Sequence, residues 1–424
     1  MKIISFLGFN EYKETTYLPP IGQENKLPCT TPFFQEALVQ FYQPESLIVL
    51  LTDKVENQKP KDKDGNELPQ TNWQALQDRI AGKVKLEAIK NIPEQNTPKD
   101  IWYIFEQITR YFEKGDSVIF DITHSFRSIP IVALLSVSYL RTVREVNIQG
   151  LLYGAFEAKD KDNKTPTFDL LPIVSLLDWI TATDQFIKTG NGETLANLLN
   201  DNNQASPARK NLAENISGIA QDLENLRPMF AMEKAYKLPE YIKKATPTFS
   251  ETVSPFATLL EQVEEDYGKF GLEEPTNFKA NPEKFLNQLL IIIEWYVKKK
   301  RMVQALCLMR EWLPCLLCYH FELDAFNKDD RSEMELLLSG GKYKNEAGIT
   351  IESKYFKKWQ ELNNQKRKKL TNLWGGDLYK LAKYRNDVLH AGFRQNPESA
   401  EAIIKQTEKI FNEVQEIAKK WKLI

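Results

Sequence analysis

The chain has 424 residues, of which 42% are hydrophobic and 27% are charged, and its formal net charge is −2. This length predicts two or three domains with large cores, and the balanced charge argues against a protein that coats nucleic acid through bulk positive charge. Residues 1–9 are too short for a signal peptide, and the most apolar stretch, 285–297, contains Glu294 and predicts a core helix rather than a membrane span. We therefore expect a cytoplasmic protein without membrane contact.

The first 172 residues alternate between strand and helix patterns. Strand patterns occupy 3–9, 46–52, 84–89, 117–122 and 145–156, and helical patterns occupy 32–42, 73–81, 98–113 and 129–143. The segment 55–72 is rich in lysine, aspartate and proline and predicts a loop. Residues 159–164 predict a hairpin turn that leads to a strand at 167–171. This alternation predicts an α/β, Rossmann-like N-terminal domain over 1–172, with a mainly parallel sheet covered by helices on both faces.

After Pro172 the sequence shows almost no strand pattern. Ser206 before Pro207, and Asn396 before Pro397, predict helix starts with an N-cap followed by proline at the first helical position. We expect an all-α connector over 173–282, with a helix-turn-helix-like arrangement as one alternative, and an all-α helical bundle over 283–424.

A polar turn follows the strand pattern at 117–122. Thr123, His124, Ser125 and Arg127 lie between this strand and the helix pattern at 129–143. In open α/β sheets, ligands bind outside the carboxyl ends of the strands, and a helix N-terminus beside an arginine favours an anion. The turn is therefore a candidate anion site, and ordinary turn chemistry is the alternative.

A second group of polar residues lies near the C-terminus, in the run 384–392 (YRNDVLHAG). His390 is able to move protons near neutral pH, and Arg385 is able to hold the charge that develops on a phosphate. With the neighbouring amide of Asn386, these residues suit the cleavage of a phosphodiester without a metal ligand. The alternative is a helix with a snorkelling arginine and a capping histidine.

The four cysteines do not predict a metal site. Cys315 and Cys318 have zinc-like spacing but no second pair. Leucines surround them, so we expect buried structural thiols and no metal.

Both polar groups carry a family resemblance. Residues 121–130 (DITHSFRSIP) resemble the signature loop of CARF domains in CRISPR-associated ribonucleases, and residues 2–12 (KIISFLGFNEY) resemble the first strand and loop of that family. Arg385-Asn386 followed by His390 looks like the HEPN nuclease motif. The order matches single-chain ribonucleases of type III CRISPR systems. Ser125 departs from the pattern, because many relatives carry glycine there.

The resemblance implies a sensor and a nuclease. The CARF domain would bind a cyclic oligoadenylate activator across the two-fold axis of a homodimer, with cyclic tetra-adenylate the commoner ligand in this sub-family. The residues expected to contact it are Gly8, Phe9, Asn10, Thr15, Thr16, Thr52, Thr123, His124, Ser125, Arg127 and Gly154. The HEPN domain would cut single-stranded RNA at a composite dimer site, with Arg385, Asn386 and His390 as catalytic residues and with no metal or further cofactor.

The sequence is also compatible with two other functions. The CARF pocket would act as a ring nuclease if it degraded its own activator. A CARF-type transcription regulator would need a basic recognition helix, whereas the connector offers only scattered lysines. Basic clusters at 298–301 and 366–369 are candidates for steering RNA, with solvated helix faces as the alternative. Arg310 and Glu311 either brace the catalytic site or form an ordinary ion pair.

Overall fold

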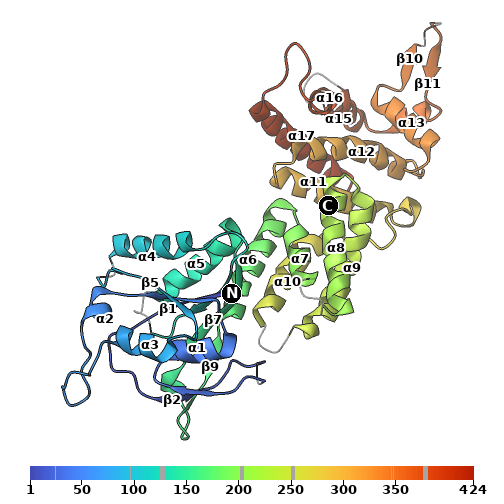
Figure 1. The fold of residues 1–424 in the computed structure, drawn as a ribbon. Coiled ribbons are helices and arrows are strands. Elements are labelled where there is room, and N and C mark those ends of the chain that lie inside the picture. Colours follow the sequence, from blue (N-terminus) through green and yellow to red (C-terminus); the bar gives the residue numbers. More distant parts are fainter. Residues whose placement is uncertain are drawn as a thin grey trace. The chain divides into compact units, whose positions relative to one another are not determined.

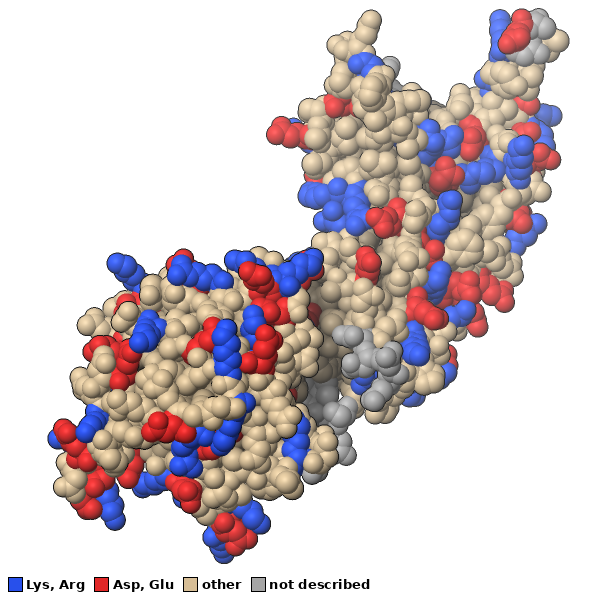
Figure 2. Space-filling model, viewed as in Figure 1, with Lys and Arg blue, Asp and Glu red and all other residues tan. Residues whose placement is uncertain are grey.

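The computed structural model describes residues 1–424 apart from 24, 96, 125–128, 201–204, 250–253, 345, 347 and 376–380 (Figure 1). The chain divides into two compact units, Met1–Leu177 and Asp178–Ile424. Within the described residues, no helix has the length and apolar character needed to cross a bilayer. Figure 2 shows lysine and arginine interspersed with aspartate and glutamate over the viewed face, which agrees with the balanced net charge.

The first unit contains a six-stranded sheet. Its strands follow the order β5 (Lys85–Ile89), β4 (Ser46–Leu50), β1 (Lys2–Phe6), β6 (Ser117–Asp121), β7 (Asn147–Gly154) and β9 (Thr167–Asp169). All neighbouring pairs are parallel except β7 and β9, which are antiparallel. The mainly parallel sheet predicted from the alternating pattern is therefore confirmed.

Helices cover both faces of this sheet (Figure 1). Helices α1 (Phe34–Tyr42) and α3 (Asn72–Ile80) pack on one face against side chains such as Ile3 and Leu47. Helices α4 (Pro98–Tyr111) and α5 (Ile129–Val143) pack on the other face against Ile4 and Ile48. Successive strand residues thus bury opposite faces, as a sheet covered on both sides requires.

Parts of the first unit differ from the prediction. A small sheet in the order β3 (Cys29–Thr31), β2 (Thr15–Tyr17) and β8 (Lys164–Thr165) was not predicted, because its strands are short and threonine-rich, without an apolar pattern. Helix α2 (Asp53–Asn57) begins the segment predicted as a loop and is capped by the side chain of Thr52. The predicted first strand ends at Phe6 instead of Phe9.

Gly154 lies where β7 packs against α1. A Cβ at this position would lie 2.8 Å from Cδ2 and 2.9 Å from Cγ of Phe34, whose side chain is fully buried. We expect Gly154→Ala to lower the free energy of unfolding by about 1–3 kcal/mol, since the core must shift to admit the methyl group. Gly150→Ala on the same strand is the matched control, because its Cβ approaches no closer than 3.4 Å to Leu152. Equal stabilities of the two variants in urea titration would contradict this account.

The second unit is built from helices. They are α6 (Leu171–Thr189, which begins in the first unit), α7 (Glu193–Asn200), α8 (Pro207–Glu224), α9 (Pro228–Ala245), α10 (Ser254–Tyr267), α11 (Pro282–Lys298), α12 (Met302–His320), α13 (Lys328–Leu338), α14 (Phe356–Glu361), α15 (Asn364–Gly375), α16 (Leu381–Leu389) and α17 (Ala400–Lys420). The predicted all-α character was wrong at one place, where β10 (Lys342–Lys344) and β11 (Thr350–Glu352) form an exposed hairpin.

Helix caps explain two of these boundaries. Ser206 accepts a hydrogen bond from the Arg209 backbone at 3.3 Å, and Pro207 follows as the first residue of α8, as predicted. The predicted start at Asn396-Pro397 was wrong. Helix α17 begins three residues later, because the Ser399 side chain accepts from the Ala402 backbone at 3.1 Å.

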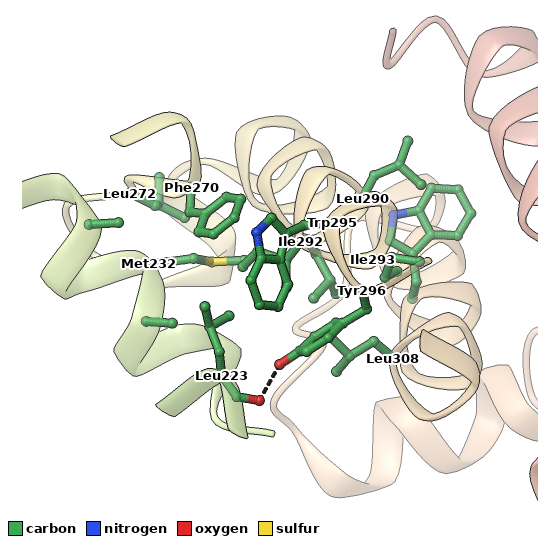
Figure 3. Packing of buried hydrophobic residues seen from close by; sticks show 14 of the residues in the cluster. Leu223, Met232, Phe270, Leu272, Leu290, Ile292, Ile293, Trp295, Tyr296 and Leu308 are labelled. Carbon is green, nitrogen blue, oxygen red and sulfur yellow. Dashed lines mark hydrogen bonds between the residues drawn. The ribbon is translucent and has the colours of Figure 1, made fainter. Parts of the chain in front are cut away.

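One hydrophobic core runs through the second unit, on both sides of the predicted boundary at 282/283. Trp295 and Tyr296 of α11 lie against Met232 and Leu223 of the preceding helices, and the Tyr296 hydroxyl donates to the Leu223 carbonyl (Figure 3). Within α12, Trp312 is fully buried, and its indole donates to the Leu286 carbonyl at 3.0 Å. The predicted connector and bundle therefore share a core.

Candidate functional site

A cavity of about 610 Å³ opens in the first unit. It lies beyond the carboxyl ends of β1 and β4, where an open α/β sheet places its ligands, and its volume falls within the range of small-molecule sites. Of the residues predicted to bind a ligand, the cavity brings together five, which are Gly8, Phe9, Asn10, Thr52 and His124. Ser125 and Arg127, also predicted, lie outside the described residues.

The loop that follows β1 is held by residues that the sequence analysis missed. The Gly8 N–H donates to the Tyr12 hydroxyl at 2.7 Å. Asn72, at the start of α3, donates from Nδ2 to the carbonyl oxygens of Gly8 and Asn10, both at 2.9 Å. A Cβ on Gly8 would lie 3.3 Å from the Tyr12 hydroxyl oxygen, so glycine allows this close approach.

The turn after β6 rests on a buried polar network. Gln35 of α1 donates to the Ser5 hydroxyl at 3.0 Å, and Ser5 donates to the Asp121 carboxylate at 2.5 Å. The second carboxylate oxygen of Asp121 accepts from the Thr123 backbone at 2.9 Å. Thr123 in turn accepts from the Gly154 backbone at 2.8 Å. The network therefore links α1, β1, β6 and β7 through Asp121 and Thr123, at the start of the predicted signature loop.

His124 faces the cavity as a neutral imidazole. Burial lowers its pKa to about 3, so the ring is uncharged at neutral pH. Its edge meets the Tyr12 ring with centroids 4.3 Å apart. In the part of the chain that the structure describes, its buried Nε2 has no hydrogen-bond partner. His124 can therefore offer a ligand a hydrogen bond, but not a positive charge.

Charges of both signs line the cavity. Its described cations are Lys13 and Lys54, and the Lys54 ammonium lies 4.1 Å from the centre of the Phe9 ring. Glu11 and Glu94 also line it. Lys54 is thus placed beside an aromatic ring, an arrangement that suits a nucleotide with a base and a phosphate.

Four predicted ligand residues do not line this cavity. Thr15 is fully buried in the small sheet, where its hydroxyl donates to the Asn163 carbonyl at 2.8 Å. Thr16 pairs with Thr30 at 2.9 Å on the same sheet. Thr123 and Gly154 are bonded to each other in the polar network. Thr52 does line the cavity, but its hydroxyl already caps α2 by accepting from the Val55 backbone at 3.3 Å.

Asp121 makes stability depend on pH. Burial raises its pKa from 3.8 to about 6, although hydrogen bonds from Ser5 and Thr123 oppose this rise. Since the folded protein binds this proton more tightly than the unfolded chain, the resulting stabilisation is complete below about pH 4 and is lost as the pH rises through about 6. We expect the unfolding free energy of Asp121→Asn, relative to wild type, to rise by on the order of 3 kcal/mol between pH 4 and 7. A difference that does not change with pH in urea titrations would contradict this assignment.

The second candidate group lies at the end of α16. The Arg385 guanidinium donates to the Asn386 side-chain oxygen at 3.0 Å, and its buried Nε has no hydrogen-bond partner among the described residues. Burial raises the pKa of the neighbouring Cys307 thiol on α12, and the Arg385 charge opposes this rise. The backbone N–H of His390 donates to the Asn386 carbonyl at 3.0 Å. The motif thus joins a half-buried arginine to an exposed histidine one turn further on.

A Schellman motif fixes the position of His390. The Gly392 N–H donates to the Asp387 carbonyl at 3.0 Å, and the Ala391 N–H donates to the Val388 carbonyl at 3.1 Å. Ala391 has a φ of 51°, in the left-handed region. His390 is therefore the C-cap residue, directly after the last helical residue Leu389, and its side chain is exposed.

Several other predicted residues have structural partners. Arg310 forms a two-point ion pair with Glu335 at 3.1 and 3.0 Å, and Glu311 pairs with Arg331. The basic cluster at 298–301 is also engaged: its four side chains contact Glu294, Ile187, Glu408 and Thr189. These contacts favour the ion-pair reading over a role in catalysis or RNA steering.

Cys29, Cys315 and Cys318 are buried thiols, and Cys307 is half-buried. All four are free, and burial raises the pKa of Cys315 to about 11 and of Cys318 to about 12. Within the described ranges, no group of three or more histidine, cysteine or acidic residues is arranged to hold a metal ion.

Two family models match within the first two thirds of the chain. Residues 2–157 match the model of the CARF domain of the CRISPR system endoribonuclease Csx1, and residues 175–277 match the model of the second domain of the CRISPR-associated protein MJ1674. The MJ1674 protein of Methanocaldococcus jannaschii is 26% identical over 159 residues, which cover 34% of this chain and 25% of that protein. The matched region thus spans a quarter of the length of this curated relative.

A solved structure is also similar. Csm6 of Enterococcus italicus, bound to cyclic hexa-2′-fluoro-hexa-dAMP, covers 100% of this chain and 94% of its own, with 10% identity and a TM-score of 0.49. Neither family model extends to residues 278–424, so the HEPN resemblance of α16 stays a prediction. Over residues 2–157 the resemblance to a CARF domain is confirmed, and the chain is similar to CRISPR-associated CARF proteins.

Proposed function

We propose that this protein is an endoribonuclease of type III CRISPR antiviral defence, which cuts single-stranded RNA without a metal after binding a cyclic oligoadenylate. One observation carries this proposal. The chain joins a region that matches the CARF domain of an endoribonuclease, with a cavity at the ligand end of its sheet, to the Arg385–Asn386–His390 group on α16.

The cavity in the first unit is the proposed activator site. Gly8 lines the cavity, and Phe9 with Lys54 offers an aromatic face and a cation for base and phosphate. His124 supplies a neutral hydrogen-bonding imidazole. By the family resemblance, two protomers share one ring across a two-fold axis, so the active species is a homodimer. Cyclic tetra-adenylate is the ring proposed first.

The group on α16 is the proposed catalytic site. The 2′-hydroxyl of the RNA attacks the adjacent phosphorus, so that a 2′-O–P bond forms and the P–5′-O bond breaks. His390 takes part in proton transfer, as the base that receives the 2′-hydroxyl proton or as the acid that protonates the leaving 5′-oxygen. Arg385 stabilises the charge on the phosphorane-like transition state, and Asn386 positions the phosphate or His390. Ligand binding shifts the population between idle and active dimers.

The chemistry of the product ends tests this mechanism. In EDTA, with activator present, we expect fragments with 2′,3′-cyclic phosphate and 5′-hydroxyl ends, identified by mass spectrometry. A matched RNA with a single 2′-deoxy residue at the cleaved position is expected to resist cutting there, because the nucleophile is missing. Fragments with 5′-phosphate ends, or cleavage that EDTA abolishes, would contradict the proposed mechanism.

A further inference from the structure

We propose that Phe393 stacks on an RNA base next to the phosphate that is cut, and so fixes where the single strand lies on the second unit. This inference rests on the proposed function and adds a substrate-positioning residue to it. The Phe393 side chain is 91% exposed. Isolated exposed apolar residues are common. The inference therefore also rests on the position of Phe393 beside His390 and on the contacts that hold its loop.

Phe393 is held close to the proposed catalytic histidine. Its backbone N–H donates to the His390 carbonyl at 2.9 Å, directly after the Schellman motif that ends α16. Gly392 between them has a φ of 71°, which turns the chain sharply. A base that flanks a phosphate held at His390 is therefore within reach of this ring.

The part of the loop that follows Phe393 is anchored back to α16. We call this anchor the clasp, formed by Asp387, Arg394 and Glu398. The buried Asp387 carboxylate accepts from Arg394 at 3.1 Å and from the Glu398 backbone at 3.4 Å. The Glu398 side chain also pairs with Lys383 of α16. The loop between α16 and α17 projects from the helices in Figure 1. The clasp holds this loop in a defined conformation.

The surroundings of the ring favour a nucleotide over a protein partner. Its neighbours along the loop are Gly392, Arg394, Gln395 and Asn396, none of which is a large apolar residue. Protein–protein hot spots lie within larger, well-packed apolar surroundings. Base stacking needs only one aromatic face near cationic groups. Arg394 is the next residue after Phe393 in the sequence, and its side chain is 42% exposed.

The test compares cleavage by ring variants with activator saturating. Since base–aromatic stacking contributes about 1–3 kcal/mol, we expect Phe393→Ala to lower kcat/KM for RNA by roughly 5- to 150-fold. Phe393→Trp, which keeps an aromatic face, is expected to retain most of the activity. Phe230→Ala is the matched control, because Phe230 on α9 is also an exposed phenyl group, at 50%, and it is expected to cut as wild type does.

A second substrate separates stacking from other roles. Once the cleaved position is mapped, an RNA with an abasic residue beside it is expected to be a poorer substrate for wild type but to cause no further loss in Phe393→Ala. Equal kcat/KM of wild type and Phe393→Ala would overturn this inference alone. A Phe393→Ala dimer that dissociates in sedimentation velocity, with activity restored at high protein concentration, would assign the ring to a contact between copies and also overturn it. Failure of wild type to cut RNA would overturn the proposed function itself.

Discussion

His390→Ala is expected to lower the rate constant for RNA cleavage by roughly 10²- to 10⁴-fold, the usual contribution of a positioned general acid or base. The imidazole is exposed at the end of α16 and forms no side-chain hydrogen bond with another described residue. Its removal should therefore leave stability and activator binding unchanged. The measurement is single-turnover cleavage of a labelled single-stranded RNA at saturating activator.

His320→Ala is the matched control for His390→Ala. His320 also lies at the last turn of a helix, α12, but its ring contacts Trp421, with centroids 4.8 Å apart. We expect this control to cut RNA at the wild-type rate. If both histidine variants cut at that rate, His390 has a capping role only, and the proposed catalytic assignment fails.

Trp312→Ala is expected to lower the free energy of unfolding of the second unit by about 3–5 kcal/mol. The side chain is fully buried within the core shared by residues on both sides of the 282/283 boundary. Its indole also donates to the Leu286 carbonyl at 3.0 Å, so the substitution leaves a cavity and a carbonyl without this donor. Urea titration of the full chain measures the change.

Two further variants separate the causes of this loss. Trp312→Phe keeps most of the buried ring but removes the hydrogen bond, so its loss should be smaller than that of Trp312→Ala. Trp102→Ala on α4 removes an indole that is 68% exposed and is expected to change stability by less than about 0.5 kcal/mol. A Trp312→Ala variant as stable as Trp102→Ala would show that the described core does not stabilise this unit.

The main elements of the first unit could be predicted because their signals are local. Buried parallel strands read as continuous apolar runs, such as Ser46–Leu50, and the segments between them show helical patterns. The small sheet formed by β2, β3 and β8 could not be predicted. Its pairing depends on contacts between Thr16 and Lys164, which are distant in the sequence and carry no apolar period.

The candidate sites show the same division. Gly8, Phe9, Asn10 and His124 follow the observed ends of their strands and line one cavity. They were predicted from the family resemblance of the loops that carry them, because the predicted first strand extended to Phe9. Asn72 has no such signal, because it reaches Gly8 across 64 sequence positions and is defined only by the packing of α3. Thr15 was predicted to contact the ligand because it lies close in sequence to the loop that follows β1. Its hydroxyl instead donates to the Asn163 carbonyl in the small sheet.

Cleavage of a fluorescent single-stranded RNA by the full chain in EDTA, with and without added cyclic oligoadenylate, tests the central claim most directly. Cyclic tetra-adenylate and cyclic hexa-adenylate would be titrated separately against the same RNA. We predict no cleavage without a ring and saturable cleavage with one of the two. Cleavage that is independent of both rings, or no cleavage when calorimetry shows that a ring is bound, would contradict the account.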